Sequence, residues 1–499
     1  MDIGRLAVVS NRLPIVLSRK RNGWHMEPGS GGLVTALSPV LRDREGIWIG
    51  WIGTIQEDLP RERVLKDLMG KGTRESGFSL RAVPLSRDEV ENYYYGFSNA
   101  ILWPLFHDLI SLCQFEPRYW DYYQSVNTKF ALTVAQHTTP NDYVWVHDYQ
   151  LILVGRELAH LGHQRRTGFF LHIPFPPLDI FLKIPWRFEI LHALLAYDLL
   201  GFQTIRDKRN FIGCVRTLLD FKVSGKGQVN NIQVGDRQVR VGAFPISIDY
   251  NEFANLALTP EVADKAWIIH ANLPQRQLIL GVDRLDYTKG IPQRLHAFGQ
   301  ALERYPEMRG KVTLVQVAVP SRQGVAEYDK LKQEIERMVG EINGKYTEVG
   351  WIPIHYIFRS LTRSELVAYY KTCEIALITP LKDGMNLIAK EYCASNIEEK
   401  GVLILSEFAG AASQLYQHAV MVNPFDVQGI AEAIHTAFHM DHEERQTRMR
   451  KLRRLVQHYD IFFWVDTFLR TAIAKRLEDF PQMEMFVPTS TLNQAMGIH

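Results

Sequence analysis

The chain has 499 residues, of which 46% are apolar and 22% are charged, and its formal net charge is +2. This length allows two or three domains with sizeable cores, and the composition is that of an ordinary globular protein. The small net charge argues against a nucleic acid or a membrane surface as the main partner.

The chain shows no sign of secretion or membrane insertion. Its N-terminus does not resemble a signal peptide, because residues 5–10 already have the pattern of a buried strand. No apolar run approaches the roughly 20 residues needed to cross a bilayer. The widely spaced cysteines form no C-x-x-C pair, which disfavours a disulfide framework or a zinc site; they are Cys113, Cys214, Cys373 and Cys393. We therefore expect a cytoplasmic α/β enzyme.

Short apolar runs alternate with helical patterns along most of the chain. A first series of expected strands covers 5–10, 143–146, 168–171 and 241–244. A second series covers 277–282, 312–318, 375–379, 402–405 and 420–422. A long amphipathic helix is expected over 323–342. Strands that are apolar on both faces and separated by helices predict parallel sheets in doubly wound α/β domains.

A hinge is expected between the two series, at 245–249, where a polar helical stretch begins. The predicted domains are 1–248 and 249–455, followed by a helix over 456–480 that packs back on the first domain. The last residues, 481–499, have the composition of a weakly ordered tail. Ligands of open α/β sheets bind beyond the carboxyl ends of the strands, so functional residues should follow strands.

The most informative stretch is 381–391, which follows the expected strand 375–379 and opens a helical pattern. A strand, a glycine turn and a helix aim backbone N–H groups and a helix N-terminus at one point, which suits a diphosphate. On a continuous helix at 1.5 Å per residue, Asp383 and Glu391 would lie about 12 Å apart. One carboxylate would then meet a sugar and the other the ribose hydroxyls. A turn of this kind also occurs without a ligand.

Cationic side chains follow several expected strands. Arg284 and Lys289 lie five residues apart in one loop after 277–282, where two cations would neutralise a diphosphate. Arg12 follows the first strand and Arg322 follows a later one, and either guanidinium would fork onto a phosphate. Solvated surface charges are the alternative interpretation for all four.

Other candidates have equally plausible structural roles. His147, Asp148 and His172 end expected strands, although a lone buried histidine is usually structural. Trp103 in an apolar run is more often part of a core than a platform for a sugar.

Gly31 and Gly32 precede a helical run and offer close approach to a helix N-terminus, although an unliganded tight turn fits equally well. The sequence contains no H-E-x-x-H, G-x-S-x-G or Walker motif, and no G-x-G-x-x-G after the first strand. No D-x-D pair suggests a metal-held diphosphate. This leaves arginine and lysine to hold such a group.

Taken together, these residues resemble the trehalose-6-phosphate synthase family of retaining glycosyltransferases. The resemblance extends from Val9 to Trp464 and implies a GT-B fold, with two Rossmann-like doubly wound parallel-sheet domains facing a central cleft. The motifs that carry it are 9–12, 97–104, 145–149, 170–176, 284–290, 383–391 and 405–412.

The resemblance also implies roles for individual residues. For the donor, it implies that Arg284 and Lys289 hold the diphosphate, with Gly31 and Gly32 close to it. The remaining implied donor contacts are His172 and Asp383 to glucose, Glu391 to ribose, and the backbone of Met385, Asn386 and Leu387. For the acceptor, the implied phosphate ligands are Arg12, Tyr94 and Arg322, and the implied lining residues are Trp51, Trp103 and Asp148.

The implied reaction moves glucose from UDP-glucose to glucose 6-phosphate and yields trehalose 6-phosphate and UDP, in trehalose biosynthesis and osmoprotection. The resemblance implies that this reaction uses neither a protein nucleophile nor a metal ion. It also implies that the partners of the protein are small molecules. Gln150 and Asp108 depart from the common pattern, as do 185–187 and 206–209. These departures leave open a glucosylglycerol-phosphate synthase, or a homologue that binds sugar phosphates without turnover. The nucleotide base also stays open, and the chain is compatible with a homo-oligomer.

Overall fold

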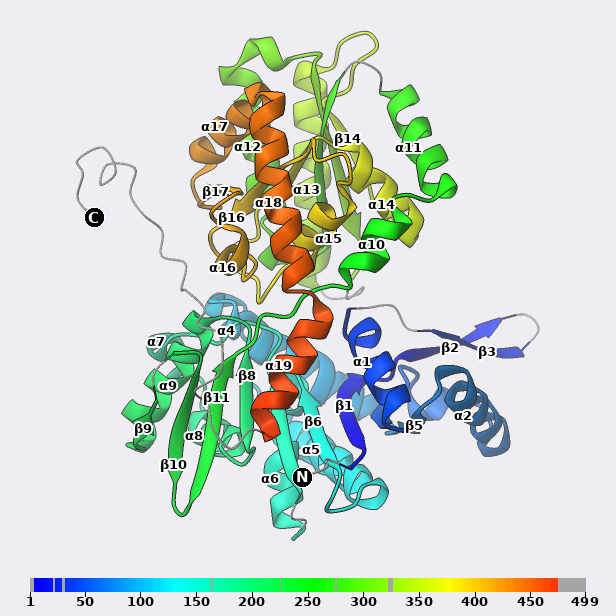
Figure 1. The fold of residues 1–499 in the computed structure, drawn as a ribbon, viewed down its shortest axis with the longest axis vertical. Coiled ribbons are helices and arrows are strands. Elements are labelled where there is room, and N and C mark those ends of the chain that lie inside the picture. Colours follow the sequence, from blue (N-terminus) through cyan, green and yellow to red (C-terminus); the bar gives the residue numbers. More distant parts are fainter. Residues whose placement is uncertain are drawn as a thin grey trace. The chain divides into compact units, whose positions relative to one another are not determined.

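The computed structural model describes residues 4–20, 23–28, 32–162, 165–225, 227–273, 276–321 and 326–473. The chain divides into two compact units, and Figure 1 shows the strands of each flanked by helices. Among the described residues, unit 1 comprises the chain up to Ile246 and residues 462–473, and unit 2 comprises Ser247–Ile461. The expected tail, 481–499, lies outside the described residues.

In its described part, unit 1 is built on nine strands: β1 (Leu6–Arg12), β4 (Ile47–Trp51), β5 (Ser79–Ala82), β6 (Tyr143–His147), β7 (Arg166–Phe170), β8 (Leu199–Phe202), β9 (Val223–Ser224), β10 (Val229–Val234) and β11 (Arg237–Ala243). Their order in the sheet is β5-β4-β1-β6-β7-β8-β11-β10-β9. The strands from β5 to β11 pair in parallel, whereas β10 pairs antiparallel with β11 and β9.

The parallel pairing expected for the first series of strands is therefore confirmed, and β10 and β9, which the sequence analysis did not predict, add an antiparallel edge. The two residues between β10 and β11 include Gly235 at φ 56°, and a two-residue turn of this kind returns the chain directly alongside itself. A second hairpin outside the sheet, also absent from the sequence prediction, joins β2 (Ile15–Lys20) to β3 (Gly23–Pro28).

The described helices of unit 1 include one unexpected form. Its α-helices are α1 (Gly32–Asp43), α2 (Glu62–Ser76), α3 (Arg87–Glu89), α4 (Trp103–Phe106), α5 (Pro117–His137), α6 (Val154–His160), α7 (Leu178–Phe181), α8 (Arg187–Leu194), α9 (Ile205–Leu219) and α19 (Ile461–Ile473). Its short 3₁₀ turns are η1 (Gln56–Asp58), η3 (Ile110–Leu112) and η4 (Tyr149–Leu151). The segment η2 (Val90–Leu102) is a π-helix of 13 residues, a rare form that is frequent at functional sites.

The helix α19 packs on the sheet of unit 1. Trp464 and Phe468 lie four residues apart and therefore on one helix face. The ring of Phe468 stacks on Trp145 of β6 with centroids 4.2 Å apart and planes 7° from parallel, and the ring of Trp464 lies 5.1 Å from the same tryptophan. The closing helix thus contributes to the core of unit 1.

In its described part, unit 2 is built on six strands: β12 (Gln277–Arg284), β13 (Val312–Val319), β14 (Ile354–Ile357), β15 (Ile375–Ile378), β16 (Val402–Ser406) and β17 (Val420–Val422). All neighbours pair in parallel, in the order β14-β13-β12-β15-β16-β17. This confirms the parallel sheet expected for the second half of the chain.

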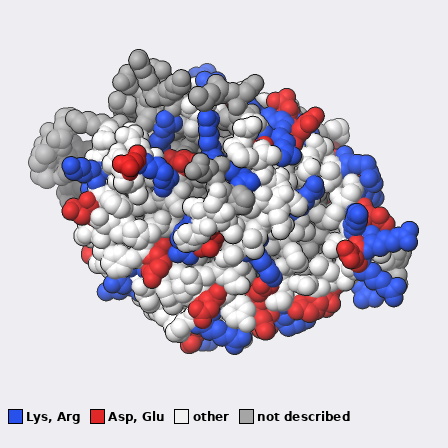
Figure 2. All heavy atoms as spheres, turned by 90° about the horizontal axis from the view of Figure 1, so that it is seen from below, with Lys and Arg blue, Asp and Glu red and all other residues white. Residues whose placement is uncertain are grey.

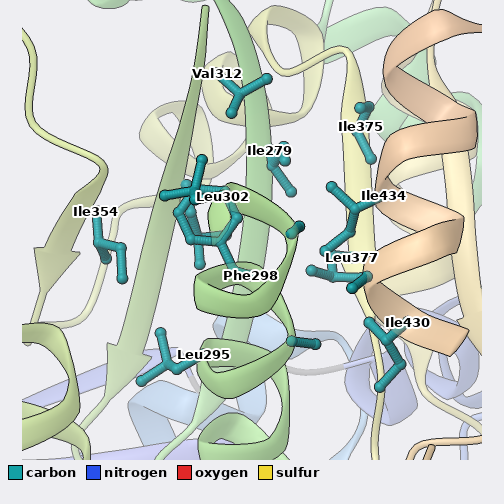
Figure 3. Packing of buried hydrophobic residues seen from close by; sticks show 14 of the residues in the cluster. Ile279, Leu295, Phe298, Leu302, Val312, Ile354, Ile375, Leu377, Ile430 and Ile434 are labelled. Carbon is teal, nitrogen blue, oxygen red and sulfur yellow. The ribbon is translucent and has the colours of Figure 1, made fainter. Parts of the chain in front are cut away.

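Helices cover the unit 2 sheet and close its core. They are α10 (Tyr250–Leu256), α11 (Pro260–Asn272), α12 (Ile291–Arg304), α13 (Ala326–Tyr346), α14 (Arg363–Thr372), α15 (Leu387–Ser395), α16 (Ala412–Leu415), α17 (Val427–His439) and α18 (His442–His458), with the 3₁₀ turns η5 (Tyr287–Lys289) and η6 (Pro306–Met308). Figure 3 shows Phe298 and Leu302 of α12 packed among Ile279 of β12, Val312 of β13 and Ile434 of α17. These five side chains are fully buried, so the core fixes α12 and α17 against the sheet.

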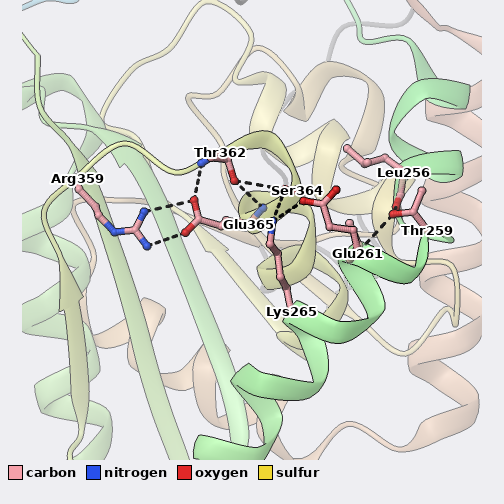
Figure 4. A network of polar contacts seen from close by, with 9 residues as sticks. Leu256, Thr259, Glu261, Lys265, Arg359, Thr362, Ser364 and Glu365 are labelled. Atoms are coloured by element: carbon pink, nitrogen blue, oxygen red, sulfur yellow. Dashed lines mark hydrogen bonds and ion pairs between the residues drawn. The ribbon is translucent and has the colours of Figure 1, made fainter.

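A polar network joins α11 to the start of α14 (Figure 4). Thr362 caps α14 by accepting the N–H of Glu365, whose carboxylate in turn accepts the N–H of Thr362. The Arg359 guanidinium donates to both oxygens of Glu365 and, with the Thr362 N–H, lowers the pKa of Glu365 to about 2. Lys265 of α11 donates to the Ser364 hydroxyl at 2.6 Å. The network fixes the first turn of α14.

None of the helices within the described ranges combines the length and apolar character that a bilayer span requires. On the face shown in Figure 2, lysine and arginine are interspersed with aspartate and glutamate. This visible face lacks the continuous basic stripe that is typical of nucleic-acid-binding proteins.

We expect Phe468→Ala to lower the free energy of unfolding of unit 1 by about 3–5 kcal/mol, because it removes a fully buried ring. Phe462→Ala on the same helix removes a ring that is 40% exposed, and should cost less than about 1 kcal/mol. Denaturant unfolding, with hydrogen exchange at β6 and β7 to identify the unit, provides the measurement. Equal effects of the two substitutions would contradict the packing of α19.

Candidate active site

Each sheet has a topological switch point. The chain first adds strands on one side of a strand, and it later returns to add a strand on the other side. In unit 1 the switch point lies between β1 and β6, and in unit 2 it lies between β12 and β15. Ligands of open α/β sheets bind outside the carboxyl ends of the strands at such a point. Most of the predicted site residues within the described ranges follow these four strands or their neighbours.

In unit 2, the loops after β12 and β15 are bonded to each other. Asp286 accepts the N–H and the hydroxyl of Thr288 at 3.0 and 2.9 Å, and the Leu381 N–H donates to the Thr288 carbonyl at 2.8 Å. Gly290 adopts φ 64°, and any Cβ at this position would collide with the Thr379 carbonyl. The approach of the two loops therefore depends on this glycine.

These loops bring Lys289 and Asp383 together. The Lys289 ammonium donates to an Asp383 carboxylate oxygen at 2.6 Å, although the two residues are 94 positions apart in the sequence. The side chains are only 9% and 16% exposed. The desolvation of a pair this secluded offsets much of its Coulomb attraction, so the pair adds little to stability. It does hold an ammonium group and a carboxylate at one point beside the switch point.

The expectation of a continuous helix from Asp383 to Glu391 is wrong. The helix α15 begins only at Leu387, and Asn386 before it adopts φ 70° and accepts the Ala389 N–H as its N-cap. Asp383 therefore lies in a turn, so the separation expected from helical rise does not apply. The Asn386 amide also donates to Asp383 at 3.2 Å, which adds a second hold on the carboxylate.

The turn at Asp383 rests on the segment after β16. The Asp383 N–H donates to the Phe408 carbonyl at 3.1 Å, and the Met385 carbonyl accepts the Ala411 N–H at 2.7 Å. Gly410 lies so close to the turn that a Cβ would collide with the Gly384 carbonyl. The motif at 405–412 thus supports the residues around Asp383.

Glu391 lies further along α15 and is bonded to α14. It accepts the Tyr370 hydroxyl at 2.8 Å, and burial raises the pKa of Glu391 above its ordinary value, although this bond and Arg363 oppose the rise. A carboxylate held in this way retains acceptor capacity for a hydroxyl pair such as that of a ribose.

Arg284 is the last residue of β12 and lies in register with Val319 of β13, so it ends the strand rather than lying in the following loop. Its side chain is exposed. The predicted donor backbone groups at Met385, Asn386 and Leu387 lie in the turn and at the start of α15. Arg284 thus lies at the carboxyl end of β12, and the turn follows the carboxyl end of β15.

Sequence reasoning missed Arg294 of α12, which is fully buried. Its guanidinium donates to Asp283 at 2.7 Å, to Gln316 at 3.1 Å and to Thr379 at 3.2 Å. It therefore joins β12 to β13 and to the loop after β15. The signal was available, because an arginine occupies an apolar position of an amphipathic helix.

In unit 1, three of the predicted acceptor residues converge. Arg12 ends β1 in register with Trp51 of β4, and its guanidinium carbon lies 4.0 Å from the Trp51 ring centroid and 5.9 Å from that of Tyr94. Gly53, at φ 92°, leaves room for the guanidinium, since a Cβ there would collide with it. Stacking of this kind orients the plane of the guanidinium, and burial lowers the pKa of Arg12 while Tyr94 opposes that change.

The π-helix η2 carries Tyr94 and leads into Trp103. The Asn99 amide donates to the Tyr94 carbonyl at 2.7 Å, and Asn99 accepts the Tyr149 hydroxyl at 2.9 Å. The Trp103 ring lies 5.8 Å from the Tyr149 ring. Nothing in the sequence distinguishes this segment from an ordinary helix, so the form of η2 was not predictable.

Asp148 follows β6 in a strained conformation, with φ 76° and ψ 167°, which is a region that only glycine adopts readily. Its carboxylate accepts the N–H of His172, the second residue after β7, at 3.1 Å. This bond positions the backbone of His172, which the resemblance implies as a contact to the donor glucose.

The His172 ring lies in a largely apolar surrounding. Its Nε2 is 3.2 Å from Nδ1 of His147, and the Trp464 ring lies 6.2 Å from it. Burial lowers the pKa of His172 to about 3 and holds the pKa of His147 well below its usual range. Both imidazoles are therefore neutral at physiological pH, and His172 suits hydrogen bonding to a sugar hydroxyl better than charge stabilisation.

Two of the predicted site residues, Gly31 and Arg322, lie outside the described residues. Gly32 is the first residue of α1, as expected for an approach to a helix N-terminus. In the described part of the chain, the one group of three residues with metal-ligand geometry does not include any residue of the two switch points.

Comparison with known proteins identifies the family of the chain. Residues 4–474 match the model of glycosyltransferase family 20. A trehalose-6-phosphate synthase from Mycolicibacterium smegmatis is 45% identical over 471 residues, which cover 93% of this chain and 91% of the relative. One from Mycobacterium leprae is 44% identical and covers 93% of each chain.

Solved structures share the fold of this chain. An α,α-trehalose-phosphate synthase (UDP-forming) from Burkholderia xenovorans, in complex with glucose-6-phosphate, has a TM-score of 0.84 and 36% identity over 94% of this chain and 100% of that chain. An E. coli trehalose-6-phosphate protein bound with UDP-2-fluoro glucose has the same TM-score and 35% identity over 94% of this chain and 99% of its own. These likenesses confirm the expected GT-B fold and the resemblance inferred from the motifs. The chain belongs to glycosyltransferase family 20.

Proposed function

We propose that the protein is a retaining glucosyltransferase that moves glucose from UDP-glucose to glucose 6-phosphate, giving α,α-trehalose 6-phosphate and UDP. The pairing of Lys289 with Asp383 carries this proposal. In a nucleotide sugar, one oxygen joins the sugar to the diphosphate, so the groups that recognise each part must be adjacent. A cation for the diphosphate and a carboxylate for the sugar hydroxyls lie 2.6 Å apart here, beside the unit 2 switch point.

The donor is bound by unit 2. Lys289 and Arg284 neutralise the diphosphate, and the turn before α15 offers backbone groups to it. Asp383, held by Asn386, accepts glucose hydroxyls, and Glu391 accepts those of the ribose. The family resemblance implies these roles, and the bonds that hold Lys289, Asp383 and Glu391 in place support them.

The acceptor is bound mainly by unit 1. Arg12, oriented by Trp51 and Tyr94, receives the phosphate of glucose 6-phosphate; the resemblance implies the same role for Arg322, which lies outside the described residues. Trp103 and Asp148 then line the acceptor sugar. The Arg12 cluster supports this role, because a guanidinium stacked on aromatic rings is preorganised for a planar, two-point contact with a phosphate.

The chemistry requires no group that the chain lacks. As the bond between glucose C1 and the diphosphate oxygen breaks, negative charge accumulates on the leaving group, where Lys289 and Arg284 stabilise it most in the transition state. The departing oxygen accepts the proton of the attacking hydroxyl on the same face of the sugar, which retains the anomeric configuration. His172 stays neutral and donates or accepts a hydrogen bond. We accordingly propose a reaction that needs no metal ion. As a separate proposal, we place the protein in the cytoplasm.

The relatives support the two substrates. One related structure is described as a complex with glucose-6-phosphate and another as bound with UDP-2-fluoro glucose. A direct test is an assay of UDP release from UDP-glucose with a panel of phosphorylated acceptors, followed by NMR of the product linkage. Release of UDP with glucose 6-phosphate and an α,α-linked product is expected. Turnover with glycerol 3-phosphate alone would contradict the proposal.

We expect Lys289→Met to lower kcat by about 100- to 1,000-fold, since one electrostatic contact to a leaving group typically contributes about 3–4 kcal/mol in the transition state. Lys345→Met, at an exposed lysine on α13, serves as the matched control and should retain normal turnover. Steady-state kinetics with melting temperatures provide the measurement. Normal turnover in a folded Lys289→Met protein would remove Lys289 from the donor site.

Glucose 6-phosphate should exceed free glucose in kcat/KM by at least about a hundredfold, because charge-assisted hydrogen bonds contribute about 1.5–3 kcal/mol each. Arg12→Ala should reduce this preference by at least about tenfold while leaving the affinity for UDP unchanged. The exposed Arg44→Ala is the control. An unchanged preference in Arg12→Ala would show that Arg12 does not hold the phosphate.

A further inference from the structure

A group of three potential metal ligands lies on the surface of unit 2, away from the switch point. Glu307 belongs to η6, which follows α12, and His435 and His439 belong to the last turns of α17. One ligand atom from each residue lies within 4.8 Å of the others. The Glu307 carboxylate oxygen is 3.0 Å from His435 Nε2 and 3.9 Å from His439 Nε2.

The arrangement is fixed by the fold rather than by chance contact of mobile side chains. His435 and His439 are four residues apart and therefore share one helix face. Buried Ile434 of α17 packs with α12 in the core shown in Figure 3, which sets the position of α17 relative to η6. The Tyr305 ring stacks on His435 with centroids 3.9 Å apart and planes 17° from parallel, which fixes the imidazole plane.

The donor distances fit a tetrahedral ion. Zinc bonds to imidazole nitrogen and carboxylate oxygen are about 2.0–2.2 Å long, so two ligands of a tetrahedral site lie about 3.4 Å apart. The separations from Glu307 to the two histidines, 3.0 and 3.9 Å, bracket this value, and the two imidazole nitrogens lie within 4.8 Å of each other. Small side-chain rotations would let an ion replace the hydrogen bond between Glu307 and His435.

We propose that Glu307, His435 and His439 form a binding site for Zn²⁺, with water in the fourth position. Two imidazoles and one carboxylate suit zinc, whereas Mg²⁺ and Ca²⁺ prefer oxygen ligands alone. The nearby Arg304 cation is engaged by Glu432 at 2.7 Å.

The position of the cluster separates it from the proposed chemistry. The turn η6 directly precedes β13, and α17 runs back from the end of β17, so the cluster lies at the amino edge of the sheet. Lys289 and Asp383 lie beyond the carboxyl ends of β12 and β15, at the opposite edge. A zinc ion would therefore tie α17 to the connection between α12 and β13 and stabilise unit 2, without a part in glucosyl transfer.

The experiment measures zinc binding to the full chain after exhaustive chelation. Isothermal titration with ZnCl₂ should give one tight site per chain, and a hundredfold excess over the Kd should raise the Tm by several degrees. Co²⁺ should give the visible absorption of a tetrahedral complex, and MgCl₂ should give no heat at this site. Chelation should leave kcat unchanged.

Matched variants distinguish this site from other histidines. His439→Ala and Glu307→Gln should each weaken binding at least tenfold and abolish the Tm rise. His160→Ala is the control, since His160 is also exposed and lies 3.9 Å from a single carboxylate, that of Glu157. The proposal is overturned if the wild-type chain binds less than one zinc ion, or if the Glu307 and His439 variants bind as the His160 variant does.

Discussion

The close approach of β12 and β15 at the centre of a parallel sheet is the constraint on which the candidate donor site depends. Each strand ends beside the other, so the loops that follow meet, and Gly290 and the bond from Leu381 to Thr288 hold them together. Buried Arg294 stabilises the same approach, because it donates hydrogen bonds to Asp283 of β12 and to Thr379, which follows β15. The ion pair of Lys289 and Asp383 is the product of this arrangement, since no local feature of either segment would place the two charges together.

The same principle orders unit 1, where β1 and β6 flank the switch point. Arg12 and Asp148 end or follow these strands, as Lys289 and Asp383 follow theirs. The supporting groups differ, however. Lys289 and Asp383 of unit 2 are held by an ion pair and by hydrogen bonds between loops, whereas Arg12 of unit 1 is oriented by the aromatic rings of Trp51 and Tyr94. The positions of Lys289 and Arg12 are thus set by different forces.

The sequence was sufficient for the strands that are apolar on both faces, because burial by helices on each side leaves a continuous apolar run. It was insufficient for the antiparallel edge, since β10 has asparagine and glutamine among its apolar residues and so lacks a continuous apolar run. It placed the candidate residues after strands, yet it did not predict the pairing of Lys289 with Asp383, which depends on two loops 94 residues apart. The start of α15 was misplaced because Asn386 at positive φ has no local signal beyond its side-chain type.

The strained backbone at Asp148 has a consequence for the evolution of the protein. A non-glycine residue at φ 76° and ψ 167° costs about 1–3 kcal/mol relative to a relaxed backbone. A change of one nucleotide would replace this aspartate by glycine and relieve that cost. Selection for thermal stability alone would therefore favour loss of the carboxylate. Its retention would then reflect selection on activity, and lineages released from that selection should lose the aspartate early.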